Sequence, residues 1–530
     1  MKFLSRTAPA ACVLLLSGCL ASNPTQEIAS SKPSAHDTEA DRKCSVSQSQ
    51  LEKFGAPDYQ QLWNRLRAGY GIEDQQHARI DRHLNWYKSH PKYIERVSKR
   101  AEKYLYHIVE QVEQRDLPME LALLPIVESA FDPFAYSHGS ASGMWQFISS
   151  TGKHYGLKQN WWYDGRRDVV AATDAALRYL AYLHRRFDGD WLHALAAYNA
   201  GEGNVRKAIR RNRKLGRPTD FWSLKLPNET KAYVPQLLAL SRVVMDPEAH
   251  GVALTPVPNT PYFASVDIGS QIDLAQAASL SGVSITDLYQ LNPGFNRWAT
   301  APSGPHHLLV PTAKAQQFRD NLAQLPQTER VSWQRYTIKS GDSLISIAKK
   351  FNTDVATLRD TNKIKGNRIR AGKTLMIPHA TKSDRAYALS TSQRIAKKQA
   401  AYGKKPGRHK VEYVVRAGDS FWSIAKKYKV GVRSLAKWNS MAPKDTLRKN
   451  QKLVIWTKNP QLASLSQGPH SNSVIRKVSY RVRNGDSLAR IAGKFNVSVN
   501  DIERWNPVNN SRYIHPGQSL TLFVDVTRIN

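Results

Sequence analysis

Apolar residues recur every three or four positions through residues 46–245, which is the spacing of one face of an amphipathic helix. Two clear series are Ile94, Val97, Ala101, Tyr104, Leu105, Ile108 and Val112, and Val169, Ala172, Ala176, Tyr179, Leu180 and Leu183. No strand-like run of alternating apolar and polar residues interrupts these series. This half of the chain is therefore predicted to form one all-α domain.

The C-terminal half repeats one pattern at residues 336–362, 413–439 and 480–506. In each copy an alternating apolar stretch leads into a Gly-Asp-Ser turn, two short helical patterns and an apolar closing run. The aspartate precedes an asparagine by 20 residues in every copy: Asp342 and Asn362, Asp419 and Asn439, Asp486 and Asn506. We predict three small βααβ (α+β) modules, at residues 335–379, 412–457 and 479–525.

A weaker fourth copy occupies residues 266–312, where Asn292 follows Ile272 by 20 residues. The Gly-Asp-Ser turn is missing, and Gln271, Ile272 and Asp273 stand in its place. We therefore predict a degenerate module that acts as a spacer rather than as a binder.

The segments between the modules differ from them in composition. Residues 382–410 carry nine Lys and Arg residues and one acidic residue, and residues 458–477 are rich in Ser, Asn and Gln. Such compositions are typical of flexible linkers, which we predict over residues 380–411 and 458–477.

The chain opens with the pattern of an export signal. Residues 1–18 contain an early positive region, an apolar stretch and small residues. The run that ends at Cys19 resembles the lipobox of bacterial lipoproteins, in which the cysteine carries the lipid and begins the mature protein. The alternative is an ordinary signal peptide that contains a cysteine. With lipidation, residues 19–45 read as a flexible tether, and Cys44 is left without an intramolecular partner.

Leu20 stands where enterobacterial lipoproteins of the inner membrane have aspartate, so the lipobox resemblance implies an outer-membrane anchor that faces the periplasm.

Composition narrows the class of protein. A hydrophobic content of 41% supports packed cores, and three cysteines are too few for a disulfide scaffold or a cysteine-built metal cage. No histidine pair has metalloprotease spacing, so we predict no metal and no cofactor. After the N-terminus no apolar run reaches 18 residues, the length typical of a membrane-spanning helix.

Glu128 is the leading candidate for chemistry because it lies within the apolar run of residues 121–131. Burial penalises the charged form of a carboxyl group and raises its pKa, so such a glutamate can act as a general acid near neutral pH. Taken alone, Glu128 is better read as a helix-surface residue whose apolar neighbours face elsewhere. Three further motifs favour the catalytic reading: Gly-Met-Trp-Gln at residues 143–146, Ala-Tyr-Asn-Ala-Gly at residues 197–201 and Glu-Thr-x-x-Tyr-Val at residues 229–234.

Taken together, Glu128-Ser129 and these motifs resemble the lytic transglycosylases with a goose-lysozyme-like catalytic domain, chiefly over residues 110–240. The repeats resemble LysM modules, which bind N-acetylglucosamine-containing glycans such as peptidoglycan. The resemblance implies a multi-domain enzyme in which an all-α lysozyme-like domain is followed by LysM modules on flexible linkers. One departure is Trp145, where many relatives have methionine, and we expect it to alter the surface that contacts the sugar.

The resemblance also implies roles for individual residues. Glu128 would be the sole acid and base, and Tyr233 the tyrosine that hydrogen-bonds it. The other positions implied to bind or position the saccharide are Ser129, Ser137, Met144, Gln146, Tyr198 and Asn199.

Most glycosidases use two carboxylates, and Asp132, Asp164, Asp168 and Glu202 are the possible partners of Glu128. Asp132 precedes proline and reads as a helix stop, while Asp164 and Asp168 flank a helix start and read as caps or dipole partners. A lytic mechanism needs no second carboxylate. Two alternatives stay open from the sequence: a hydrolytic lysozyme on the same fold and a non-catalytic scaffold that binds murein.

The formal net charge of +34 would suit nucleic acid, but export and glycan modules exclude that partner. We expect the positive charge to serve the acidic peptide stems of peptidoglycan and the anionic envelope. The sequence does not indicate protein partners.

Overall fold

The structure is a computed structural model that describes residues 60–137, 139–404, 407–459, 462, 475–495, 497, 499–506 and 514–525. The predicted signal peptide at residues 1–18, Cys19, the tether at residues 19–45 and Cys44 lie outside the described residues, as does most of the predicted linker at residues 458–477. Within the described part of the chain, no helix is long and apolar enough to cross a membrane.

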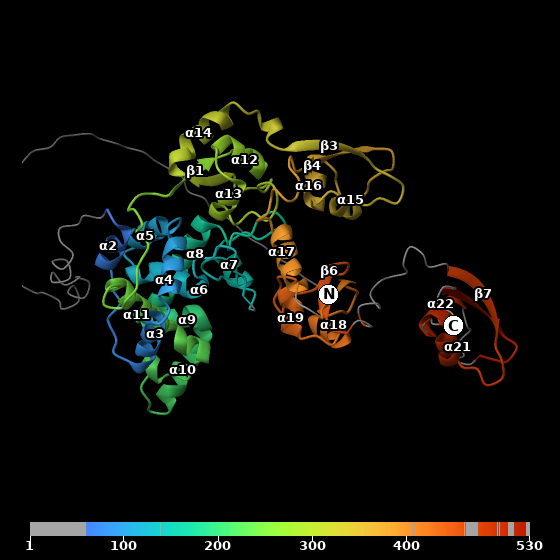
Figure 1. The fold of residues 1–530 in the computed structure, drawn as a ribbon, viewed down its shortest axis with the longest axis horizontal. Coiled ribbons are helices and arrows are strands. Elements are labelled where there is room, and N and C mark those ends of the chain that lie inside the picture. The colour runs from blue at the N-terminus through green and yellow to red at the C-terminus, as the bar shows by residue number, and fades with distance from the viewer. Residues whose placement is uncertain are drawn as a thin grey trace, which may run out of the picture. The chain divides into compact units, whose positions relative to one another are not determined.

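The first half of the described chain is helical, as the apolar spacing predicts (Figure 1). Its α-helices are α2 (Leu62–Ala68), α3 (Ala78–Lys88), α4 (Pro91–Ala101), α5 (Leu105–Glu113), α6 (Leu124–Ser129), α7 (Ser149–His154), α8 (Val169–Arg186), α9 (Trp191–Ala200), α10 (Glu202–Lys214) and α11 (Asn228–Met245). Two short 3₁₀ helices join them, η1 (Met119–Leu123) and η2 (Phe221–Ser223).

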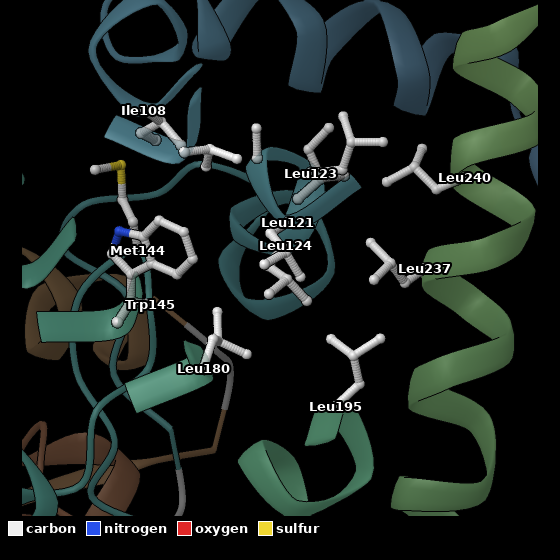
Figure 2. Packing of buried hydrophobic residues seen from close by; sticks show 14 of the residues in the cluster. Ile108, Leu121, Leu123, Leu124, Met144, Trp145, Leu180, Leu195, Leu237 and Leu240 are labelled. Carbon is white, nitrogen blue, oxygen red and sulfur yellow. The ribbon is translucent and has the colours of Figure 1, made fainter. Parts of the chain in front are cut away.

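One apolar core holds this domain together. Figure 2 shows Leu121, Leu123 and Leu124 of the η1–α6 segment facing Leu237 and Leu240 of α11. All five side chains are at most 1% exposed. Burying a leucine side chain stabilises the fold by about 1.5–3 kcal/mol, so this segment is fixed firmly in the centre of the domain.

The second half contains four small modules, each with two antiparallel strands and two helices between them. The first has β1 (Phe263–Asp267), α12 (Leu274–Ser281), α13 (Ile285–Leu291) and β2 (His307–Pro311), followed by α14 (Thr312–Ala323) and η3 (Gln327–Glu329). The other three have β3 (Ser332–Thr337), α15 (Leu344–Lys350), α16 (Val355–Thr361) and β4 (Thr374–His379); β5 (His409–Val414), α18 (Phe421–Lys427), α19 (Val432–Trp438) and β6 (Lys452–Thr457); and β7 (Ile475–Arg481), α21 (Leu488–Lys494), α22 (Val499–Trp505) and β8 (Ser519–Asp525).

The asparagine that recurs at the same place in each repeat has a structural role, and all four modules share it. In the module of β5 and β6, the Asn439 side-chain amide donates to the carbonyls of Leu435 and Val454, and its oxygen accepts from the Val454 backbone N–H at 2.7 Å. The residues that bond in the same way to their own helix and closing strand are Asn292, Asn362 and Asn506. The asparagine therefore ties the second helix to the closing strand, in the degenerate module as in the others.

The degenerate module, which contains β1 and β2, is larger than its repeat pattern predicts. Helix α14 follows β2 directly, and its residues Phe318 and Leu322 are buried in the same cluster as the strands and helices of that module. The predicted boundary at residue 312 therefore falls short of the domain's end.

The predicted flexible linker over residues 380–411 differs from the structure. Helix α17 (Thr391–Gly403) occupies much of it, and Tyr387 before that helix is only 1% exposed. The alanine, lysine, arginine and glutamine residues that make the segment look like a linker are also good helix formers. Composition alone did not separate these two outcomes.

Candidate active site

Glu128 lies in the last turn of α6 and points toward α11. The Tyr233 hydroxyl donates a hydrogen bond of 2.7 Å to its Oε1 atom. Burial raises the pKa of Glu128 to about 7, although the hydrogen bond from Tyr233 acts in the opposite direction; the negative charge of Glu229 raises it further. The carboxyl group therefore keeps its proton close to neutral pH, as a general acid requires.

Helix α6 ends abruptly after the candidate acid. Ala130 and Phe131 both have φ of 53°, a left-handed conformation that is uncommon for residues other than glycine. Phe131 is 1% exposed and its ring stacks near Tyr104, so packing holds the strained turn in place. Asp132 accepts the Phe134 backbone N–H at 2.9 Å and so shapes the following turn, but α6 has already ended at Ser129, three residues before the predicted helix stop. Strain of this kind concentrates at functional sites.

The segment at residues 143–147 is held against the backbone of the next loop. Gly143 has φ of 84°, and a side-chain carbon at this position would lie 2.0 Å from the Arg166 carbonyl oxygen. Only glycine fits there. The Ser129 hydroxyl donates to the Met144 carbonyl at 3.1 Å, which joins this segment directly to α6.

Two residues of this segment face the core rather than the surface. Met144 is 2% exposed and Trp145 is fully buried, and both lie in the apolar cluster that Figure 2 shows. The Trp145 indole N–H donates to the Thr173 hydroxyl at 3.0 Å. The predicted saccharide contact of Met144 and the predicted effect of Trp145 on the sugar-contacting surface therefore do not agree with the structure. The tight turn at Gly143 directs both side chains inward.

Gln146, Tyr198 and Asn199 stay partly exposed, and hydrogen bonds tie them to the neighbouring motifs. The Tyr198 hydroxyl donates to the Trp145 carbonyl at 2.9 Å, and the Gln146 amide donates to the Gly143 carbonyl at 2.7 Å. Thr230 in the first turn of α11 donates to the Asn199 side-chain oxygen at 2.8 Å. The ends of α6 and α9, the segment at 143–147 and the start of α11 are thus joined by direct hydrogen bonds.

Ser137 acts on its own loop. Its hydroxyl oxygen accepts the backbone N–H groups of Gly139 and Ala141 at 3.2 and 3.1 Å. The serine therefore shapes the turn that precedes the 143–147 segment, and within the described part of the chain its hydroxyl forms no hydrogen bond to Glu128.

The possible second carboxylates are engaged elsewhere. Asp164 pairs with the Arg166 guanidinium at 2.8 Å, which helps to hold the pKa of its carboxyl below its usual range. Asp168 caps α8 by accepting the Ala171 N–H, as predicted. Glu202 pairs with Arg186 and Arg206, each at 3.1 Å. In the described part of the chain, Glu128 therefore has a tyrosine as its hydrogen-bond partner, and none of these carboxylates is paired with it.

Sequence reasoning missed two residues that shape this site. Thr230 fixes Asn199, and Glu229 acts on the pKa of Glu128 through its charge. Both lie inside the Glu-Thr-x-x-Tyr-Val motif, so the motif itself was the available signal.

Three protein families match parts of the chain. The transglycosylase SLT domain matches residues 106–221, and the LysM-like domain of lytic transglycosylase MltD matches residues 262–327. The LysM domain matches residues 336–378, 413–456 and 480–523, which confirms the three predicted modules. Fold, site and modules thus define a lytic transglycosylase that carries LysM domains.

The relatives narrow this class further. Membrane-bound lytic murein transglycosylase D of Escherichia coli K12 is 39% identical over 469 residues, which cover 84% of this chain and 96% of that protein; the sequence of the O6:H1 strain gives the same values. A putative tributyltin chloride resistance protein of an Alteromonas species is 41% identical over 33% of this chain and 84% of its own length. The chain belongs to the family of membrane-bound lytic murein transglycosylase D.

Proposed function

We propose that this chain cleaves the β-1,4 bond between N-acetylmuramic acid and N-acetylglucosamine in peptidoglycan without consuming water, and that it acts in cell-wall turnover. The observation that carries the proposal is Glu128, which is half-buried, has a pKa raised by desolvation to about 7 and is held by Tyr233. Family membership supports the same activity.

Glu128 acts twice in the proposed reaction. Its protonated carboxyl gives the proton to the glycosidic oxygen, the bond from this oxygen to muramyl C1 breaks, and N-acetylglucosamine leaves. The substrate's acetamido group stabilises the oxocarbenium-like C1. The ionised Glu128 then takes the proton of the muramyl C6 hydroxyl, and the C6 oxygen bonds to C1 to close a 1,6-anhydro ring. The proton returns to Glu128, so the cycle needs no other acid.

We assign supporting roles to the residues around Glu128. Tyr233 orients the carboxyl group, while Gln146, Tyr198 and Asn199 position the saccharide and its acetamido group. The hydroxyl of Ser129 fixes the backbone below the acid, and that of Ser137 fixes the adjoining loop.

Mass spectrometry of products released from purified sacculi tests the reaction. The chain from Leu20 onward and its Glu128→Gln variant are compared. Disaccharide products lighter by one water, with no reducing muramyl end and none from the variant, support the proposal. Reducing ends would make the protein a hydrolytic lysozyme, and binding without release would make it a scaffold.

We further propose that the LysM modules hold the enzyme to murein and that a lipid on Cys19 anchors it to the outer membrane, facing the periplasm. Family membership and the LysM domains support a place in the cell envelope. Incorporation of a palmitate analogue that Cys19→Ser abolishes would support the anchor. Incorporation that survives the substitution would place the lipid elsewhere.

A further inference from the structure

Asp273 caps helix α12 from a fully buried position and accepts bonds from a distant segment of the chain. Its carboxylate accepts the Thr381 backbone N–H at 2.9 Å and the Thr381 hydroxyl at 2.8 Å. The Tyr387 hydroxyl lies 2.9 Å from both carboxylate oxygens. These partners follow the first LysM module in sequence, more than a hundred residues after Asp273.

The same aspartate also holds the chain before that module. Its backbone N–H donates to the Arg330 carbonyl at 2.8 Å, two residues before strand β3 begins. The first LysM module spans β3 to β4 and ends at His379, two residues before Thr381. One buried residue of the LysM-like domain therefore binds both the entry and the exit of the neighbouring module.

Comparison with the repeats shows that capping alone does not explain an aspartate here. The equivalent residues at the start of the first helix in the LysM modules are Ser343, Ser420 and Ser487. Each accepts the backbone N–H of its own helix, and each is exposed. A serine thus suffices as a cap, and the longer carboxylate of Asp273 adds bonds that the three serines do not make.

Apolar packing accompanies these hydrogen bonds. Tyr387 is 1% exposed and belongs to the core cluster of the LysM-like domain, against which Ala386 and Leu389 also pack. Segment 380–389 is therefore a structural part of the LysM-like domain, although the first LysM module separates the two in sequence.

The LysM-like domain is itself bonded to the catalytic domain. The Asp164 backbone N–H donates to the Gly294 carbonyl at 2.8 Å, and the Arg167 guanidinium donates to the Pro293 carbonyl at 2.9 Å. The rings of Tyr163 and Phe295 lie 5.4 Å apart.

We propose that the LysM-like domain binds segment 380–389 of its own chain. Asp273 thereby holds both ends of the first LysM module, an arrangement that we call the clasp. This module then moves with the LysM-like domain as one body. The existence of the clasp does not depend on the proposed function. The use of the clasp rests on that function: it holds a glycan bound by the first LysM module at a set distance from Glu128.

Pulsed electron paramagnetic resonance tests the clasp without reference to activity. Nitroxides are placed at Arg319 of the LysM-like domain and Lys349 of the first LysM module, both exposed, in the chain from Leu20 with Cys44→Ser. We expect one narrow distance distribution in this chain. Asp273→Ser, which keeps the cap but cannot reach Tyr387, is expected to broaden the distribution at least twofold.

Two matched variants keep the test decisive. Tyr387→Phe keeps the buried ring and loses the hydroxyl's bonds to Asp273 together with its contacts to Thr381 and the Lys382 N–H within the same segment. It decides the outcome if Asp273→Ser unfolds the domain. Tyr289→Phe removes a hydroxyl from the same core cluster, where it bonds the Arg297 carbonyl instead. We expect Tyr387→Phe to broaden the distribution and to speed amide exchange in residues 380–389 at least fivefold, and Tyr289→Phe to do neither. A broad distribution in the parent chain, or equal effects of the two tyrosine variants, would overturn the clasp.

Discussion

The Tyr233 hydroxyl donates to Glu128 Oε1 at 2.7 Å, so the candidate acid of α6 receives its bond from α11, 105 residues further along the chain. A hydrogen bond to an ionised carboxylate stabilises the charged form. Tyr233 therefore lowers the pKa of Glu128, while burial raises it to about 7 overall. The relationship makes Tyr233 a positioning residue that also sets the pH range of the acid.

The first prediction concerns the pH profile of cleavage. Because the protonated form of Glu128 starts the reaction, kcat/KM should fall as pH rises above about 7. Tyr233→Phe removes a bond that favours the charged form, so the pKa of Glu128 rises and the fall moves to higher pH. We expect the rate itself to drop about ten- to a hundredfold, since general acid catalysis supplies roughly 10²–10⁴-fold and the carboxyl loses its orientation.

Tyr87→Phe is the control for this profile. Tyr87 is a buried tyrosine whose hydroxyl donates to the Gln236 carbonyl on the same helix, α11. This variant should leave the position of the alkaline fall unchanged. An unchanged fall in Tyr233→Phe as well would mean that Glu128 is not the group that titrates.

A second glutamate links the stability of the catalytic domain to pH. Glu120 in η1 is 2% exposed and accepts the backbone N–H groups of Gly71 and Ile72 at 3.1 and 2.9 Å. Burial raises its pKa from 4.5 to about 7. The folded state therefore binds an additional proton between these values, so this contribution is complete below about pH 4.5 and is lost as pH rises through about 7. At 1.36 kcal/mol per pKa unit, the contribution is on the order of 3 kcal/mol.

Hydrogen exchange in the η1–α6 core measures this contribution. After correction for the intrinsic pH dependence of exchange, the free energy of opening should fall between pH 5 and pH 8 in the parent chain. Glu120→Gln has no titrating group at this position, so we expect a smaller fall, by on the order of 2 kcal/mol. The raised pKa of Glu128 makes a contribution with the same dependence on pH. Placing Glu128→Gln in both the parent chain and the Glu120→Gln chain therefore isolates the effect of Glu120. Equal slopes with and without Glu120 would contradict the prediction.

A third prediction separates packing from saccharide binding at Trp145. Thr173→Val removes the buried oxygen that accepts the Trp145 indole N–H. A buried donor without a partner costs about 1–3 kcal/mol, so the catalytic domain should unfold at a lower temperature. KM for sacculi should change less than twofold because the indole is fully buried. A raised KM with unchanged thermal stability would contradict the prediction and indicate that Trp145 contacts the saccharide.

Local patterns in the sequence were sufficient to predict those parts of the structure that depend on the spacing of nearby residues. The helices of residues 62–245 follow the three-to-four spacing, and the asparagine spacing marks a bond between a helix and its closing strand. Glu128 is the candidate acid because four motifs occur together in the sequence. The sequence did not reveal that Thr230 and Glu229 act on the site.

The errors share a physical cause, which is dependence on distant backbone. Met144 and Trp145 turn inward because Gly143 lies against the Arg166 carbonyl, a contact that no short motif encodes. Segment 380–389 is ordered because Tyr387 reaches Asp273, 114 residues away. A basic, polar composition gives no sign of such a partner.

The last prediction concerns the asparagine shared by the modules. Asn439→Ala removes bonds to the Leu435 carbonyl and to both backbone groups of Val454. Leaving such groups without partners costs about 1–3 kcal/mol each where they are buried, so strand β6 should lose amide protection by at least about tenfold. Strand β4 pairs only with β3 among the described strands, and it should keep its protection. Asn362→Ala is the matched variant, and it should expose β4 and leave β6 protected. Loss of protection in both strands from either substitution would show that the modules unfold together, and no loss in either would show that the asparagine is not what holds the closing strand.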